Sequence, residues 1–171
     1  GSWFGRWGIN YVYGTWCAMT CLKAAGFDYD SPIISRAAKW LVGKQNGDGG
    51  WGERASTYMQ PNVRCASTAS QTAWALIALT SFDTPYKKEI LAGLDFLKRT
   101  QTDEGTWNES EYTGTGFPGY GLGAKVDLRN GAPLPQGKEL ARGFMLNYNW
   151  YRHYFPLTSL GKAEKYFENR K

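Results

Sequence analysis

The chain has 171 residues, of which 16% are aromatic and 20% are charged, and its formal net charge is +5. This length suffices for one hydrophobic core, and the aromatic residues supply bulky side chains to fill it. The basic residues are scattered or lie close to Asp and Glu, so we expect no nucleic-acid partner. No apolar run approaches the ~20 residues that a membrane-spanning helix requires.

The first quarter of the chain predicts two helices with marked ends. We expect one helix over about residues 11–25, with Gly26 as its C-terminal cap. Ser31 is a favoured N-cap residue, and Pro32 suits the first helical position because its missing N–H has no partner there in any case. The second helix is therefore predicted over about residues 32–44.

A polar loop over residues 46–66, which includes Glu53, separates these helices from a third. Thr68 and Gln71 have the spacing of a capping box, which marks the start of a helix. Residues 72–80 are apolar nearly all round. Such a helix is buried on most sides, as an inner helix of a two-layered helical ring would be.

The second half of the chain predicts two more helices around an irregular segment. Thr84 and Pro85 have the cap-plus-proline pattern of a helix start, and an amphipathic stripe follows them, which indicates an outer helix. Residues 108–137 contain Gly and Pro and little periodicity, so we expect a loop there. A last helix is predicted over residues 138–155, with Pro156 interrupting it.

An aromatic stripe marks this last predicted helix. Phe144, Tyr148, Tyr151 and Phe155 are spaced by four, three and four residues, and would share one helix face. Such a stripe is most often part of a core. It also has a chemical use, because the negative face of an aromatic ring stabilises a nearby cation without supplying a lone pair that would trap it.

A turn motif, Gln-x-x-x-Gly-x-Trp, repeats along the chain and follows a predicted helix each time. A truncated copy opens the sequence, and Trp3 is its tryptophan. The defining residues of the full copies are Gln45, Gly49, Trp51, Gln101, Gly105 and Trp107. Gly permits a tight turn, Gln can bond the free groups at a helix end, and Trp covers the turn. Copies separated by 48 and 56 residues indicate an array of helical hairpins whose motifs are structural.

This repeat resembles that of the triterpene cyclases, and further blocks are similar to the bacterial squalene-hopene cyclases in particular. These blocks are residues 1–11, 67–74, 112–119 and 151–156. The resemblance implies an all-α fold, part of an α/α barrel. It also implies that residues 1–171 are the C-terminal portion of a longer catalytic domain, with the missing N-terminal part as a partner.

The resemblance implies a protonation-initiated cyclisation of squalene or a related polyprene to a pentacyclic triterpene, with no metal or organic cofactor. It implies that the aromatic residues of the matching blocks line the cyclase cavity, with Trp7 and Tyr13 near the initiating acid. The other cavity residues carried over are Phe117, Phe144, Tyr148 and Tyr151. It further implies peripheral, monotopic attachment to the cytoplasmic side of a membrane.

Two alternatives stay open at this point. The sequence contains no Asp-x-Asp-Asp motif, the acid motif of the family, so a non-catalytic helical module that binds a lipid or a protein is one of them. A prenyltransferase-type barrel is the other, but its zinc site needs Asp, Cys and His at set spacings, which Cys65 and His153 lack. We expect no metal, and we interpret Cys17, Cys21 and Cys65 as reduced, buried residues.

Overall fold

The computed structural model describes residues 1–170 except 6, 59, 61–62 and 117–143. Within these residues it contains five α-helices, one short 3-10 helix and a two-stranded antiparallel sheet. In chain order the elements are α1 (Tyr11–Ala24), α2 (Pro32–Lys44), η1 (Ala55–Tyr58), α3 (Ala69–Thr80), α4 (Lys87–Thr100), β1 (Gly114–Gly116), β2 (Phe144–Leu146) and α5 (Tyr151–Glu168).

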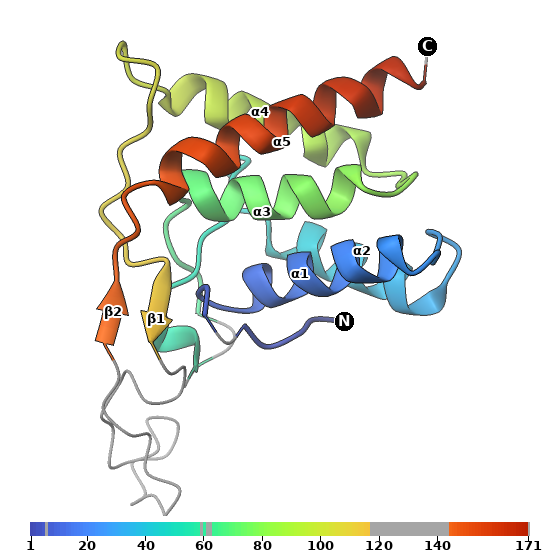
Figure 1. Cartoon of the computed structure of the whole chain (residues 1–171), viewed down its shortest axis with the longest axis horizontal. Helices are drawn as coiled ribbons and strands as arrows, with labels where there is room; N and C mark the ends of the chain where they lie inside the picture. The colour runs from blue at the N-terminus through green and yellow to red at the C-terminus, as the bar shows by residue number, and fades with distance from the viewer. Residues whose placement is uncertain (6, 59, 61–62, 117–143, 171) are drawn as a thin grey trace, which may run out of the picture.

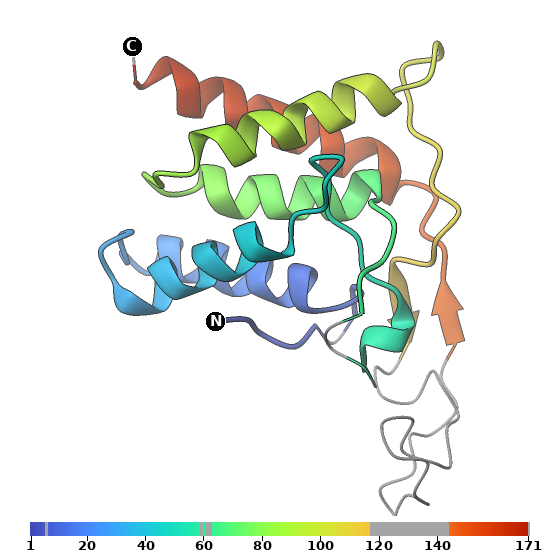
Figure 2. The same ribbon diagram turned by 180° about the vertical axis from the view of Figure 1, so that it is seen from behind.

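The helices form two layers. Helices α1, α3 and α5 run in the same direction in one layer, and α2 and α4 run in the opposite direction in the other (Figures 1 and 2). Helix α3 lies between α1 and α5 and also contacts α4. This alternation of inner and outer helices confirms the predicted all-α fold, part of an α/α barrel.

Helix α3 is the centre of the core. All of its residues from Ala69 to Leu79 are buried, which agrees with the buried inner helix predicted over residues 72–80. The N–H of Gln71 donates to Oγ1 of Thr68 at 3.2 Å, which is half of the predicted capping box. The other half is absent, because the N–H of Thr68 donates to the carbonyl of Trp51 instead. The start of α3 is therefore tied to the second turn motif.

The outer helices begin close to their predicted starts. Helix α2 starts at Pro32 as predicted, although the Ser31 side chain makes no capping hydrogen bond. Helix α4 starts at Lys87, later than the Thr84 and Pro85 pair indicated. The Thr84 carbonyl accepts the Tyr166 hydroxyl at 3.2 Å, which holds this residue against α5 and outside α4.

Of the helix predicted over residues 138–155, the structure describes residues 144–155, and the prediction is wrong for residues 144–150. Phe144 pairs with Gly116 across the small sheet, and α5 begins only at Tyr151. Pro156 lies inside α5 and does not interrupt it. It removes one hydrogen bond from the second turn of an 18-residue helix, and the tertiary packing of α5 on α3 offsets that loss.

The two complete turn motifs have the same internal geometry. Gly49 and Gly105 both adopt left-handed φ angles, 88° and 78°. The side-chain amide of Gln45 donates to the Gly49 carbonyl at 2.8 Å, and that of Gln101 donates to the Gly105 carbonyl at 2.9 Å. Each glutamine therefore closes its own turn, in a conformation that glycine adopts without strain.

The tryptophans of these motifs fix each turn to the helix before it. The indole N–H of Trp51 donates to the Leu41 carbonyl of α2 at 2.7 Å, and that of Trp107 donates to the Leu97 carbonyl of α4 at 2.8 Å. Both rings are buried. Each indole thus donates to a carbonyl near a helix C-terminus, where the helix itself leaves carbonyls unpaired.

Candidate functional site

Aromatic side chains from all three inner helices meet at the end of the layer where these helices begin. We call this group the aromatic cluster: Trp7, Tyr13, Trp16, Trp74, Tyr148, Tyr151 and Phe155. Trp74 of α3 is fully buried at its centre. Its ring lies 5.0 Å from Tyr13, 5.9 Å from Tyr151 and 5.4 Å from Phe155, all edge-to-face. These separations are those of favourable aromatic pairs.

The rim of the aromatic cluster lies beside the small sheet. Tyr148 stacks on Tyr151 with ring centroids 4.4 Å apart, and Trp7 lies 6.3 Å from Tyr148. Trp7 is 42% exposed. The cluster therefore extends from a buried centre to the protein surface.

The structure brings together four of the six candidate cavity residues, namely Trp7, Tyr13, Tyr148 and Tyr151. These four residues come from two loop segments and two helices. The expected single helix face does not exist, because Tyr148 precedes α5 and Phe144 lies in β2. Phe117 lies outside the described residues. Trp16 and Trp74 belong to the same cluster, but they were not identified as candidates from the sequence. Both lie within predicted helices, where their positions could not be distinguished from those of ordinary core residues.

Burial in this cluster raises the pKa of two of its tyrosines, Tyr13 and Tyr151. Burial, with a smaller contribution from the nearby Cys17, raises the pKa of Tyr13 to about 12. Burial likewise raises the pKa of Tyr151 well above its ordinary value, while a hydrogen bond with Trp7 acts in the opposite direction. At neutral pH both phenols are thus neutral hydrogen-bonding groups.

Two buried carboxyl groups hold the beginnings of the inner helices that carry the aromatic cluster. Glu53 accepts the N–H groups of Asn10 at 2.9 Å and Val12 at 2.8 Å, at the start of α1. Glu109 accepts the N–H of Ser70 at 2.9 Å and its hydroxyl at 2.8 Å, at the start of α3. Carboxylates in this position satisfy free N–H groups and complement the helix dipole.

These glutamates occupy the same place in the repeat. Glu53 follows Trp51 by two residues, and Glu109 follows Trp107 by two. The motif therefore extends to Gln-x-x-x-Gly-x-Trp-x-Glu, in which the glutamate caps an inner helix. The shared spacing was the signal in the sequence, but Glu53 was assigned to a polar loop. Burial raises the pKa of both carboxyl groups, and their hydrogen-bond donors oppose that rise.

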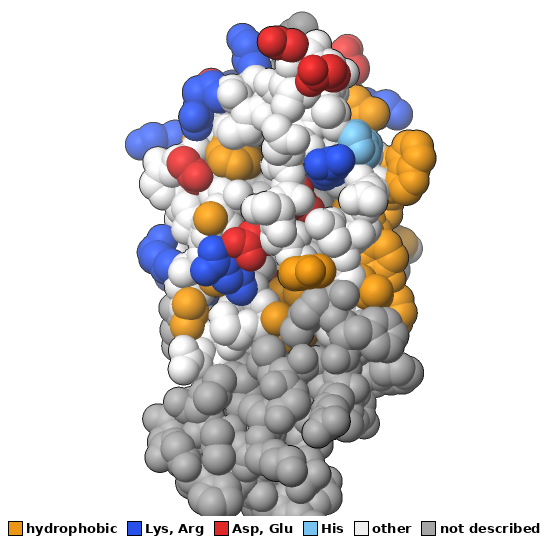
Figure 3. Space-filling model, turned by 90° about the vertical axis from the view of Figure 1, so that its left-hand side faces the viewer, with side chains coloured by type: hydrophobic (Ala, Val, Ile, Leu, Met, Phe, Trp, Pro, Cys, Tyr) orange, Lys and Arg blue, Asp and Glu red, His pale blue; other side chains and the backbone are white. Residues whose placement is uncertain are grey.

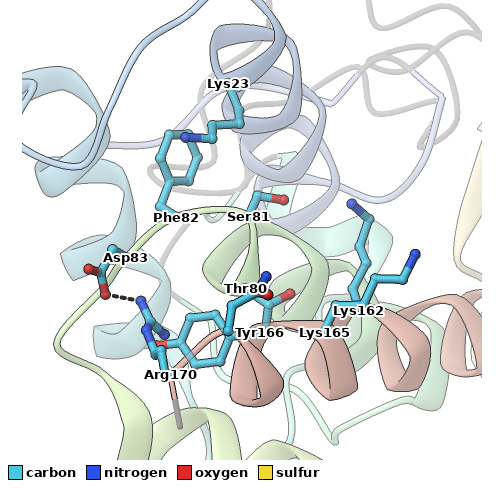
Figure 4. A pocket seen from close by; sticks show the side chains of 10 residues that line it. Lys23, Thr80, Ser81, Phe82, Asp83, Lys162, Lys165, Tyr166 and Arg170 are labelled. Atoms are coloured by element: carbon cyan, nitrogen blue, oxygen red, sulfur yellow. Dashed lines mark hydrogen bonds and ion pairs between the residues drawn. The ribbon is translucent and has the colours of Figure 1, made fainter.

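A cavity of a different character lies at the opposite end of α3 from the aromatic cluster. Its volume is about 480 Å³, and Lys23, Lys162, Lys165 and Arg170 line it (Figure 4). Arg170 forms an ion pair with Asp83. Cationic side chains do not suit a hydrocarbon ligand, so this cavity is a poor alternative to the aromatic cluster.

Cysteine and metal chemistry find little support in the described part of the chain. Cys17 and Cys21 are exposed, so the prediction that all three cysteines are buried is wrong for two of them, whereas Cys65 is buried. In the ranges that the structure describes, no three Cys, His, Asp or Glu side chains gather closely enough to hold a metal ion.

One face of the molecule shows where apolar groups reach the surface. In the view from the side of the small sheet, hydrophobic side chains gather along one edge, beside the single histidine (Figure 3). Trp150 is the most exposed of the large hydrophobic residues, at 75%, and Tyr154 is 42% exposed. Each helix in the described ranges is too short or too polar to cross a bilayer.

Helical hairpins joined by Gln-x-x-x-Gly-x-Trp turns define this chain as a segment of a repeat-built α/α barrel. Comparison with known proteins then gives the family. The family model described as the squalene-hopene cyclase C-terminal domain matches residues 1–134, so the chain belongs to the squalene-hopene cyclase family.

Relatives with curated names agree with this assignment. The chain is 40% identical over 165 residues to a probable squalene-hopene cyclase of Sinorhizobium fredii, covering 95% of this chain and 22% of the relative. It is 41% identical to the squalene-hopene cyclase of Alicyclobacillus acidocaldarius, covering 99% and 24%. It is 32% identical to the lanosterol synthase of Saccharomyces cerevisiae, covering 98% and 20%. The chain thus spans less than a quarter of the length of these relatives.

A solved structure shares the fold. A protein from Actinoplanes matches with a TM-score of 0.62 at 18% identity, covering 95% of this chain and 46% of that one. At this identity the likeness concerns the fold alone.

Proposed function

We propose that the chain is the C-terminal part of a squalene-hopene-type cyclase, an isomerase that protonates squalene or a related polyprene and closes it into a pentacycle. The names of the relatives support this proposal, and the aromatic cluster is the observation that carries it. The acid would come from outside residues 1–171. No metal or organic cofactor is part of the proposal.

The aromatic cluster suits a reaction that passes through carbocations. Each ring face within about 6 Å of a cation stabilises that cation by roughly 0.5 to 2 kcal/mol when water is excluded from the site. Tyr148 and Tyr151 stack in the cluster beside Trp7 and Tyr13, so several rings could act on one cation in succession. In this proposal Trp7 and Tyr13 lie near the protonation step, where the neutral Tyr13 hydroxyl hydrogen-bonds the acid region.

Substitution of Tyr151 in the complete enzyme tests this proposal. Tyr151→Ala removes one ring, so we expect the rate of squalene cyclisation to fall about 2- to 30-fold and incompletely cyclised products to accumulate. Tyr151→Phe keeps the ring and should keep most of the rate. Tyr112→Ala is the matched control, since Tyr112 is exposed and outside the aromatic cluster. Unchanged products from Tyr151→Ala would contradict the proposal, as would a parent enzyme inert toward squalene.

We further propose peripheral attachment to the cytoplasmic side of a membrane, which would give access to an apolar substrate. The exposed Trp150 and Tyr154 support it, because such rings favour the interface between water and lipid. Sedimentation of the complete protein with anionic vesicles is the test. Trp150→Ser should release the protein into the supernatant, and equal sedimentation of variant and parent would contradict the proposed contact.

A further inference from the structure

Two glycines lie opposite each other where the beginning of the chain meets β1. Gly8 and Gly114 form an antiparallel bridge, and two backbone hydrogen bonds of 2.9 Å flank the pair. These bonds run from the N–H of Ile9 to the carbonyl of Thr113 and from the N–H of Thr115 to the carbonyl of Trp7. The two glycines are therefore a non-hydrogen-bonded pair, at which side chains on the two strands would point to the same face.

A ring of the aromatic cluster packs against each glycine of this pair. A β-carbon on Gly8 would overlap the ring of Tyr13, and a β-carbon on Gly114 would lie 2.6 Å from Cε2 of Tyr148. Both glycines are buried, and neither has a left-handed φ angle, so other residues could adopt their backbone conformation. The rings, and not the backbone, therefore require glycine at these two positions.

The backbone beneath the two rings is held from the start of α3. The side-chain amide of Gln71 donates to the Ile9 carbonyl at 2.8 Å. Glu109, which accepts the N–H of Ser70, also accepts the hydroxyl of Thr113 at 3.3 Å. Pairing of β1 with β2 holds the same segment from its other side. An added β-carbon would therefore displace the ring above it and leave the glycine backbone in place.

Other closely packed glycines have different neighbours. A β-carbon on Gly52 would overlap the carbonyl of Ala66, which is a backbone contact, and one on Gly93 would lie 2.9 Å from Leu76, in the core. Tyr13 and Tyr148 are only half-buried. A ring displaced from Gly8 or Gly114 can thus move toward its exposed side without opening the core.

We propose that Gly8 and Gly114 are positioning residues, each of which fixes the place of one ring and so sets the shape of the cyclase cavity. Gly8 acts through Tyr13, near the protonation step. Gly114 acts through Tyr148, beside the later cations. The effect on catalysis rests on the proposed function, because it requires that these rings face the reacting polyprene, whereas the placement of the rings does not depend on the chemistry.

Alanine variants of the complete enzyme test the effect on the reaction. Gly114→Ala should lower the rate of squalene cyclisation about 2- to 30-fold and raise the share of incompletely cyclised products, because the Tyr148 ring leaves its place. Gly8→Ala should lower kcat by about 10- to 100-fold with the product mixture unchanged, because misplacement of Tyr13 affects the start of the reaction.

Gly47→Ala is the matched control, since Gly47 is exposed and an added β-carbon there meets no atom of the described residues within 4 Å. This variant should keep both the rate and the products of the parent. Simple loss of folded enzyme would lower the rate but would not alter the product mixture. A parent-like product mixture from Gly114→Ala would therefore overturn the proposal.

A double-mutant cycle in the complete enzyme gives a readout that requires no activity. Gly114→Ala should lower the melting temperature of the parent, and should lower it less in a Tyr148→Ala background, where no ring opposes the added β-carbon. Gly8→Ala should behave in the same way with Tyr13→Ala. Equal decreases in the two backgrounds would overturn the proposal whatever the substrate. Unequal decreases in an enzyme inert toward squalene would support the placement of the rings and contradict the proposed function alone.

Discussion

The tryptophans of the two complete turns and two tryptophans of the aromatic cluster, Trp16 and Trp74, differ in what their indole N–H groups contact. In the turns, Trp51 and Trp107 donate to helix carbonyls at 2.7 and 2.8 Å. In the cluster, the indole N–H groups of Trp16 and Trp74 are buried with no acceptor among the described residues. The two rings lie parallel, 6.0 Å apart.

This difference separates two uses of the same side chain. A buried donor without an acceptor costs about 1–3 kcal/mol, so native cores rarely keep one without a reason. In the turns the N–H is part of the structure. In the aromatic cluster the ring faces and edges make the contacts, which is the arrangement expected where aromatic surface itself is needed.

The largest expected effect is loss of a turn tryptophan. Trp51→Ala removes a fully buried ring and leaves the Leu41 carbonyl without its donor, so we expect a loss of about 3–5 kcal/mol in unfolding free energy. Trp16→Ala, at a half-buried position in the cluster, should cost less. Urea unfolding of both variants measures the difference. Equal losses would remove the distinction between turn and cluster.

A second pair of variants isolates the N–H group. Trp51→Phe and Trp74→Phe delete similar ring volume at fully buried positions, but only the first breaks a hydrogen bond. Trp51→Phe should therefore be less stable than Trp74→Phe by about 1–3 kcal/mol. The difference in unfolding free energy follows from the urea midpoints of the two variants, provided that the slope of free energy against urea concentration is the same for both. A larger loss from Trp74→Phe would mean that the cluster N–H has a partner after all.

The parts of this fold that could be predicted from sequence are those set by local chemistry. Helix α2 starts at Pro32 as expected, and Gly26 ends α1 with a positive φ. The largely apolar residues 72–80 predicted a buried inner helix, which α3 is. In each case the residues that set the outcome are neighbours in the chain, so their pattern carries the information.

The errors concern residues whose environment is set by distant contacts. The four-three-four spacing of Phe144 to Phe155 matched a helix, yet Phe144 is held in a strand by pairing with Gly116, 28 residues earlier. Glu53 looked like a loop residue because its partners, the N–H groups at the start of α1, lie more than 40 residues away. Spacing alone cannot reveal such pairings.

A smaller effect is expected from the buried carboxyl groups, as a change in the pH dependence of stability. Burial raises the pKa of Glu109 above the ordinary 4.5, so the folded protein keeps this proton to higher pH than the unfolded chain does. The contribution of Glu109 to the unfolding free energy is fully present below its pKa in the unfolded chain. This contribution is lost as pH rises through its pKa in the folded protein.

Glu109→Gln should remove this dependence. We expect the unfolding free energy of the parent to fall as pH rises above 4.5, and that of Glu109→Gln to fall less steeply. Glu53→Gln should act in the same direction, because its pKa is also raised by burial. Urea midpoints between about pH 4 and about pH 8 measure the slopes. Parallel slopes for parent and variants would show that these carboxyl groups titrate alike in the folded and unfolded chains.

The smallest effect is expected two residues further on, at Glu111. Its carboxylate pairs with Arg54 at 2.6 Å, but the Arg54 side chain is 55% exposed, so water and salt screen the pair. Glu111→Gln should leave the urea midpoint and its pH slope close to those of the parent. A pH slope as altered as that of Glu109→Gln would mean that burial does not distinguish these carboxylates. The raised pKa of Glu109 would then lose its explanation, whereas the hydrogen bonds from Ser70 that cap α3 would be unaffected.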